Sequence, residues 1–163
     1  MSTPSVPPGA LPVPALVRAY VAAKYYWQHR GEWHLFAIGQ PVVALERLYP
    51  HVDTFGAISA WNPHSVQLEE SVNRSADREL HAQLVASGRP CCPSYASAGN
   101  RAWREPGWIA MGLPVDEFDA LLRRFRQLAG VWWTRGNAAR LRVDAPCPPG
   151  FDGGASTRSR AAL

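Results

Sequence analysis

This sequence is poor in charged residues and in cysteine, and it contains no long apolar run. Charged residues form 18% of its 163 residues, below the roughly 25% typical of globular proteins. Its three cysteines, Cys91, Cys92 and Cys147, are odd in number and two are adjacent, which rarely suits a disulfide framework or a zinc site. No run of about 18 apolar residues occurs, and residues 1–14 lack the charged start and apolar stretch of a secretory signal. These absences predict a cytoplasmic protein in a reducing compartment, without a membrane partner.

Motifs of the common enzyme classes are also missing. There is no GxSxG, no Walker loop and no GxGxxG, so hydrolase, nucleotide-hydrolysing and dinucleotide-binding functions have no positive support. Asp77 and His81 are spaced four apart, as two metal ligands on one helix are, but HExxH is absent and the other histidines are scattered. We therefore expect a solvated helix side and no metal. Cys91 and Cys92 are candidate nucleophiles, although free thiols act more often as small apolar residues.

The abundant residues are apolar, aromatic and arginine. Hydrophobic residues form 47% of the chain and include seven Trp, five Tyr and five Phe, which is enough for one core and, at this length, predicts one domain. Arginine dominates the basic residues, Lys24 being the single lysine, and the formal net charge is +4. Residues 120–143 hold six arginines and no Asp or Glu. This stretch is a candidate anion-attracting face.

The first half of the chain alternates short helical and strand patterns after a Pro-rich start. Residues 1–14 and 144–163 have the composition of disordered tails, which predicts a folded domain over residues 15–143. The pattern from residue 15 predicts a short helix over 15–21, a hairpin of 23–29 and 33–38 around Arg30-Gly31, a helix from Pro41 to Pro50 and a buried strand over 54–60.

The second half carries the two clearest helical patterns. Apolar residues follow helical spacing over residues 68–87 and again over 115–128, where acidic residues begin the helix and arginines end it. We predict short strands near 90–95 and 108–112 separated by a loop over 96–107, and a hairpin of 130–134 and 139–143. Because helices and strands alternate while two hairpins intrude, we predict an α+β fold: a single two-layer domain with a mixed β-sheet, packed helices and two hairpins.

Several groups of residues in this layout recur together in a known order. They are Ser59-Ala60-Trp61-Asn62-Pro63 at a strand end, Asn73 and Leu80 in the next helix, Trp103-Arg104-Glu105-Pro106, and Arg123-Arg124-Phe125-Arg126-Gln127 before Trp132-Trp133. With them the chain resembles, over about residues 20–143, the bacterial family called Domain of Unknown Function three-two-nine-three. Ala76 and Gly107 depart from its pattern, where many members have a polar or basic residue and a Ser. The resemblance implies the fold boundaries and the place of a site, but no activity.

The turn from Ser59 to Ser65 is the best candidate site. Ser59, Asn62, His64 and Ser65 gather donors and acceptors between a buried strand and a long helix, a common position for ligands. The alternative is a structural turn in which Asn62 bonds the backbone and Pro63 fixes the bend. The candidate ligand-binding residues are Ser59, Trp61, Asn62, Ser65, Asn73, Trp103, Glu105 and Arg124.

These candidates predict a domain that binds a small polar or anionic molecule. Trp103 would cover the ligand, and Glu105 would bind a polar group or transfer a proton. Alternatively, Trp103 plugs the core edge and Glu105 pairs with a surface arginine. The rival function is a nucleic-acid or protein interaction module that uses the Arg-rich C-terminal face. The sequence names no cofactor, no catalytic residue and no oligomeric state, and it leaves open whether the chain is an enzyme.

Overall fold

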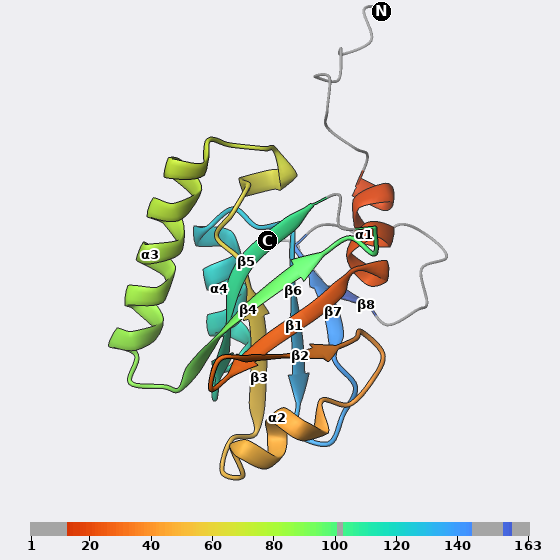
Figure 1. The fold of residues 1–163 in the computed structure, drawn as a ribbon, viewed down its shortest axis with the longest axis vertical. Coiled ribbons are helices and arrows are strands. Elements are labelled where there is room, and N and C mark those ends of the chain that lie inside the picture. The colour runs from red at the N-terminus through yellow and green to blue at the C-terminus, as the bar shows by residue number, and fades with distance from the viewer. Residues whose placement is uncertain (1–12, 101–102, 145–154, 158–163) are drawn as a thin grey trace, which may run out of the picture.

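The computed structural model describes residues 13–100, 103–144 and 155–157, which form one α+β domain. Four α-helices pack around an eight-stranded sheet within these residues, as Figure 1 shows. The elements are α1 (Val13–Ala22), β1 (Lys24–His29), β2 (Glu32–Phe36), α2 (Val43–Leu48), β3 (Thr54–Ile58), the 3-10 turn η1 (Pro63–Ser65), α3 (Glu70–Ala86), β4 (Cys91–Ser97), β5 (Arg104–Met111), α4 (Val115–Arg124), β6 (Ala129–Thr134), β7 (Arg140–Val143) and β8 (Ala155–Thr157).

The sheet is mixed, as predicted, and its strand order is β2-β1-β4-β5-β3-β6-β7-β8. Strands β1 to β7 pair antiparallel, while β8 pairs parallel to β7. Most of the two predicted tails, including Cys147, lies outside the described residues, and β8 falls within the segment predicted as the second tail. None of the helices that the structure describes is both long and apolar enough to cross a membrane.

Both predicted hairpins are confirmed, and their turns explain their residues. In the β1–β2 hairpin, Arg30 and Gly31 have φ angles of 48° and 82°. Two consecutive positive φ angles are the signature of a type I′ turn, whose twist matches that of the strands it joins. In the β6–β7 hairpin the positive φ falls at Gly136, at 79°.

The predicted loop over residues 96–107 is too long, because half of it belongs to strands. β4 and β5 pair continuously from Cys91↔Ala110 to Ser97↔Arg104, which leaves residues 98–103 as the connection. Pro93 and Pro106 are tolerated in these strands because each lies beyond the register of the strand on its other side. Glu105 is therefore held on a strand and not on a loop.

The helices lie on both faces of the sheet. Successive residues of β3 face opposite sides of the sheet. Phe55 belongs to an apolar cluster with residues of α1 and α2, while Ile58 belongs to a cluster with residues of α3 and α4. In Figure 1 α3 lies along one side of the sheet and α1 along the other. Helix α4 ends at Arg124, earlier than the predicted residue 128, because Arg126 has a left-handed φ of 53°.

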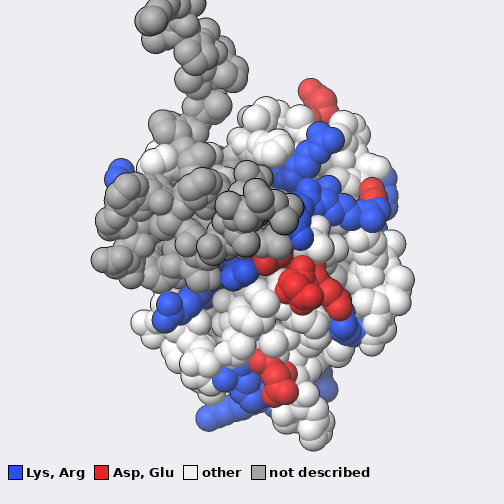
Figure 2. All heavy atoms as spheres, turned by 180° about the vertical axis from the view of Figure 1, so that it is seen from behind, with Lys and Arg blue, Asp and Glu red and all other residues white. Residues whose placement is uncertain are grey.

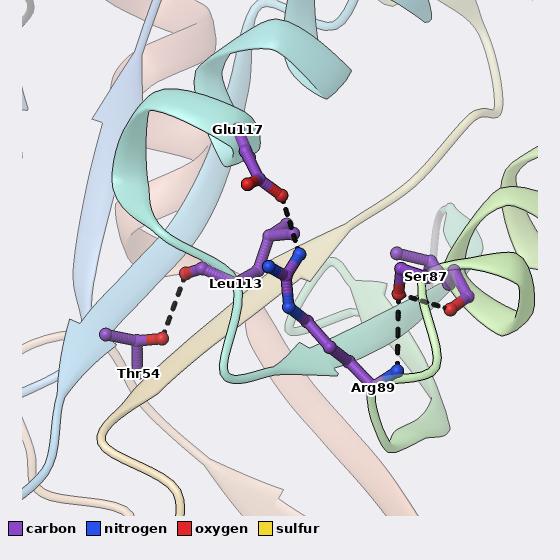
Figure 3. Close-up of polar contacts among 6 residues, drawn as sticks. Thr54, Ser87, Arg89, Leu113 and Glu117 are labelled. Carbon is purple, nitrogen blue, oxygen red and sulfur yellow. Dashed lines mark hydrogen bonds and ion pairs between the residues drawn. The ribbon is translucent and has the colours of Figure 1, made fainter.

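Polar contacts fix the connections that lead into β4 and α4, as Figure 3 shows. The hydroxyl of Thr54, at the start of β3, donates to the carbonyl of Leu113 over 2.9 Å. Arg89, between α3 and β4, forms an ion pair of 2.6 Å with Glu117 in the first turn of α4. Ser87 ends α3 by donating to the Leu84 carbonyl over 2.6 Å. These contacts hold the end of α3 and the start of α4 near the edge of the sheet where β3 begins.

Candidate functional site

The turn that follows β3 has an unusual backbone. Asn62, His64 and Ser65 have φ angles of 47°, 56° and 59°, a region that residues other than glycine rarely adopt and that costs on the order of 1–3 kcal/mol each. The turn is held by the Ser65 N–H, which donates to the Asn62 carbonyl over 2.8 Å, and by the His64 N–H, which donates to the Arg126 carbonyl over 2.8 Å. Such strained residues cluster at binding sites, so the turn is a site candidate on geometry alone.

Asn62 and Asn73 form a reciprocal pair that ties the turn to α3. The Asn62 N–H donates to Asn73 Oδ1 over 2.9 Å, and Asn73 Nδ2 donates to Asn62 Oδ1 over 2.8 Å. Asn62 Oδ1 also accepts the Leu68 N–H at 3.1 Å, and Asn73 Nδ2 donates to the Leu68 carbonyl at 3.3 Å. Because Asn73 is only 2% exposed, its bonds to Asn62 and Leu68 are partly shielded from water, and together the four bonds fix the orientation of both amides.

Glu105 receives the remaining amide donor of Asn62. Asn62 Nδ2 donates to Glu105 Oε1 over 3.3 Å. Burial raises the pKa of the Glu105 carboxyl to about 7, and the hydrogen bond from Asn62 opposes part of that rise. The guanidinium of Arg104 does not neutralise it, since its Cζ stacks on Tyr95 at 3.9 Å from the ring centroid. Glu105 is thus a carboxyl that gains or loses a proton near neutral pH.

A cleft of about 760 Å³ opens where these residues meet. Its size suits a small organic ligand. The walls come from α1, the turn after β3, the start of α3 and the start of β5. Six of the predicted site residues line it: Trp61, Asn62, Ser65, Asn73, Trp103 and Glu105.

Two predicted site residues lie elsewhere. Ser59 lines a smaller cavity of about 50 Å³, which shares Tyr20 and Glu105 with the cleft, and its hydroxyl donates to the Pro106 carbonyl over 2.7 Å. Arg124 does not reach the cleft, because at the end of α4 its guanidinium pairs with Glu79 of α3 over 2.8 Å. The prediction that Arg124 supplies charge to the same pocket therefore has no support in the geometry.

Comparison with known proteins finds one family whose model matches part of the chain. Residues 58–129 match the family model described as Protein of unknown function (DUF3293). The chain resembles that family. The DUF3293 match covers less than half of the chain, a shorter stretch than the expected 20–143, but it runs from the end of β3 to the start of β6 and so contains every predicted site residue. No curated protein and no solved structure matches the chain.

Several residues of the cleft were missed by the sequence analysis. Tyr20 of α1 lines it, and its hydroxyl bonds to that of Ser65. Burial raises the pKa of Tyr20, so this phenol stays protonated at neutral pH. No pattern in the sequence places α1 over the turn, because that contact joins segments forty-five residues apart. The other missed lining residues are Leu16, Ala19, Gln67, Leu68, Glu69, Glu70 and Arg104.

The Arg-rich stretch does not form a uniformly basic face. Arg135 donates to the carbonyls of Val52 and Glu46 over 2.8 and 3.0 Å and also to that of Tyr49. Arg142 pairs with the buried Asp119, with Nη2 and Oδ2 2.8 Å apart. In Figure 2, which shows the molecule from behind, blue and red side chains lie side by side on the described surface. At least two of the six arginines in residues 120–143, Arg135 and Arg142, therefore stabilise the fold.

The other candidate chemistries have little geometric support. Asp77 accepts a bond from Trp108 Nε1 over 3.1 Å, and His81 stacks on the same Trp108 ring with 3.8 Å between centroids. Among the described residues no group of three or more His, Cys, Asp or Glu side chains could hold a metal ion. Burial raises the pKa of Cys91 and raises that of Cys92 to about 12. Both thiols are then protonated near neutral pH and poor nucleophiles.

Replacing Glu105 by Gln should change how stability depends on pH. In the folded chain the Glu105 pKa of about 7 lies above its ordinary value, so the wild type loses stability as pH rises from that ordinary value to about 7. Glu105→Gln carries no ionisable group and escapes this loss. Urea unfolding at pH values from about 5 to about 8 should therefore show the variant gaining stability over the wild type as pH rises. The exposed Glu79→Gln is the control, and equal pH profiles for all three proteins would contradict the assignment.

Proposed function

We propose that this chain binds a small polar ligand in the cleft formed by the turn after β3, the start of α3 and the start of β5. The observation that carries the proposal is Glu105. It is a largely buried carboxyl that lines a 760 Å³ cleft, and among the described residues the side-chain group that donates to it is the Asn62 amide nitrogen, 3.3 Å away. Leaving a buried carboxyl so sparsely bonded costs stability, which is a common property of binding and catalytic sites.

The rest of the cleft supports this function. The hydrogen bonds between Asn62 and Asn73 fix the amides before any ligand arrives, and preorganised groups lose little entropy on binding. Trp61 and Trp103 add aromatic surface to the polar wall, a combination typical of small-molecule sites. With a pKa of about 7, Glu105 also meets the requirement for proton transfer in an enzyme.

Thermal melts of the full chain against a panel of small polar metabolites test the proposal. A compound at about 100 times its Kd should stabilise the chain by about 2.7 kcal/mol and raise Tm by several degrees. Asn62→Gly should abolish that increase, because glycine tolerates the φ of 47° at this position and the change removes only the side chain. The exposed Arg140→Ala is the matched control and should respond like the wild type.

Two results would count against the proposal. One is a panel in which no compound raises Tm. The other is a Tm increase that survives in Asn62→Gly, since the compound would then bind elsewhere. The rival function, nucleic-acid binding, predicts instead a salt-sensitive electrophoretic shift that Arg123→Ala and Arg140→Ala weaken and Asn62→Gly leaves unchanged. Both arginines are exposed, so these substitutions should leave the fold intact.

A further inference from the structure

The cleft combines aromatic side chains with carboxylates. Tyr20, Trp61 and Trp103 all line it, and the rings of Tyr20 and Trp103 meet edge to face with 6.5 Å between centroids. The faces of such rings are electronegative and attract organic cations. Aromatic side chains that approach one another from separate elements, here α1 and the start of β5, surround a ligand from more than one side.

The formal charges of the described lining residues are mainly negative. Glu69, Glu70 and Glu105 contribute three carboxylates, and Arg104 contributes the one cation among them. Glu70 is partly neutralised by the exposed Arg74, with Nε and Oε1 2.7 Å apart. Arg104 is engaged with Tyr95 and Trp33, at 3.9 and 5.9 Å from their ring centroids, and neither ring lines the cleft.

Among the described lining residues an anion would meet three carboxylates and only one basic group, Arg104. The start of α3 would ordinarily attract an anion, but Glu69 and Glu70 occupy that start. Their carboxylates offset the positive end of the helix dipole. The anionic part of the initial ligand prediction is therefore disfavoured by the charges that the cleft presents.

We propose that the ligand carries an organic ammonium group, which lies against the rings of Tyr20, Trp61 and Trp103 with its charge balanced by Glu105. This inference rests on the proposed ligand-binding function and adds the charge of the ligand. The rest of the molecule needs hydrogen-bonding groups for the amides of Asn62 and Asn73. On a chain whose net charge is +4, the described wall of the cleft carries three carboxylates and one basic group, Arg104, whose guanidinium is stacked on Tyr95.

Calorimetric titration of the full chain with three probes of the same shape tests this charge preference. Choline carries a permanent trimethylammonium group. Dimethylbutanol has carbon in place of that nitrogen and is neutral. Dimethylbutyrate is an anion of similar size, with a carboxylate in place of the hydroxymethyl group. At about pH 8 choline should bind at least about tenfold more tightly than dimethylbutanol, because Glu105 is then mostly ionised. At about pH 6 the preference should fall several-fold. In Glu105→Gln it should be small and independent of pH, while Glu79→Gln should behave like the wild type.

The outcomes separate this inference from the function on which it rests. Equal affinities for choline and dimethylbutanol, or tighter binding of dimethylbutyrate, would overturn the ammonium inference and leave a ligand-binding cleft standing. A choline preference that persists in folded Glu105→Gln would also overturn it, because the charge would then be balanced elsewhere. If none of the probes binds at millimolar concentration, the inference falls, while the metabolite panel still decides the proposed function.

Discussion

Gly107→Ala is expected to destabilise the chain by about 3 kcal/mol. A Cβ atom at this position of β5 would lie 2.4 Å from the Ile58 carbonyl oxygen, 3.0 Å from its carbon and 3.2 Å from the Ser59 Cα. All three are backbone atoms, which cannot rotate away as a side chain does. The substitution must therefore separate the end of β3 from β5, and urea unfolding measures the cost as a lower midpoint with an unchanged slope.

The same separation would disturb the candidate site. Ser59 bonds to the Pro106 carbonyl over 2.7 Å, and the turn with Asn62 begins immediately after it. Gly99→Ala is the matched control, since a Cβ there meets nothing within 4 Å, and its stability should stay within about 0.5 kcal/mol of the wild type. If both variants lost the same stability, the close approach of β3 and β5 would not be what requires glycine at residue 107.

Asn73→Ala is expected to cost about 2–4 kcal/mol and to abolish ligand binding. The substitution leaves the Asn62 N–H and the Leu68 carbonyl without their side-chain partner and opens space at a position that is 2% exposed. Asn62 would then be free to rotate, and Glu105 would lose the orientation of its donor. Urea unfolding gives the stability, and the Tm increase with a compound from the metabolite panel gives the binding.

Two further variants show whether the amide itself matters. Asn73→Asp keeps the acceptor for the Asn62 N–H but places a buried carboxylate oxygen against two acceptors, Asn62 Oδ1 and the Leu68 carbonyl, so it should destabilise the chain at least as much as Asn73→Ala. Ser75→Ala, exposed on the same helix, should change stability little. An Asn73→Ala protein that retains wild-type stability and full ligand binding would show that the amide pair does not organise the cleft.

Much of this fold could be predicted because its signals are local. The apolar spacing over residues 68–87 anticipates α3, and Arg30-Gly31 marks the turn of the first hairpin. The resemblance to DUF3293 drew attention to Asn62, Asn73 and Glu105, which lie far apart in the sequence yet are linked by hydrogen bonds in the structure.

The features that the sequence did not indicate depend on contacts between distant segments. The strand that carries Glu105 was predicted as a loop. Pro106 is accommodated in this strand because the pairing of β3 with β5 ends at Trp108, which the sequence does not reveal. The requirement for glycine at residue 107 follows from the closeness of β3. Arg124 was predicted to line the pocket. Its ion pair with Glu79, which lies in another helix, cannot be recognised from the sequence.

Chemical-shift mapping of the isotope-labelled full chain, titrated with a compound that raises its Tm, tests most directly whether the cleft is the binding site. The account predicts that the largest shifts fall on the backbone amides of Asn62, Leu68 and Asn73 and on the side-chain amide of Asn62, and that Glu105→Gln reduces them. Shifts centred on Arg123, Arg126 and Arg140 with the Asn62 amides unmoved would contradict the account and favour the arginine face.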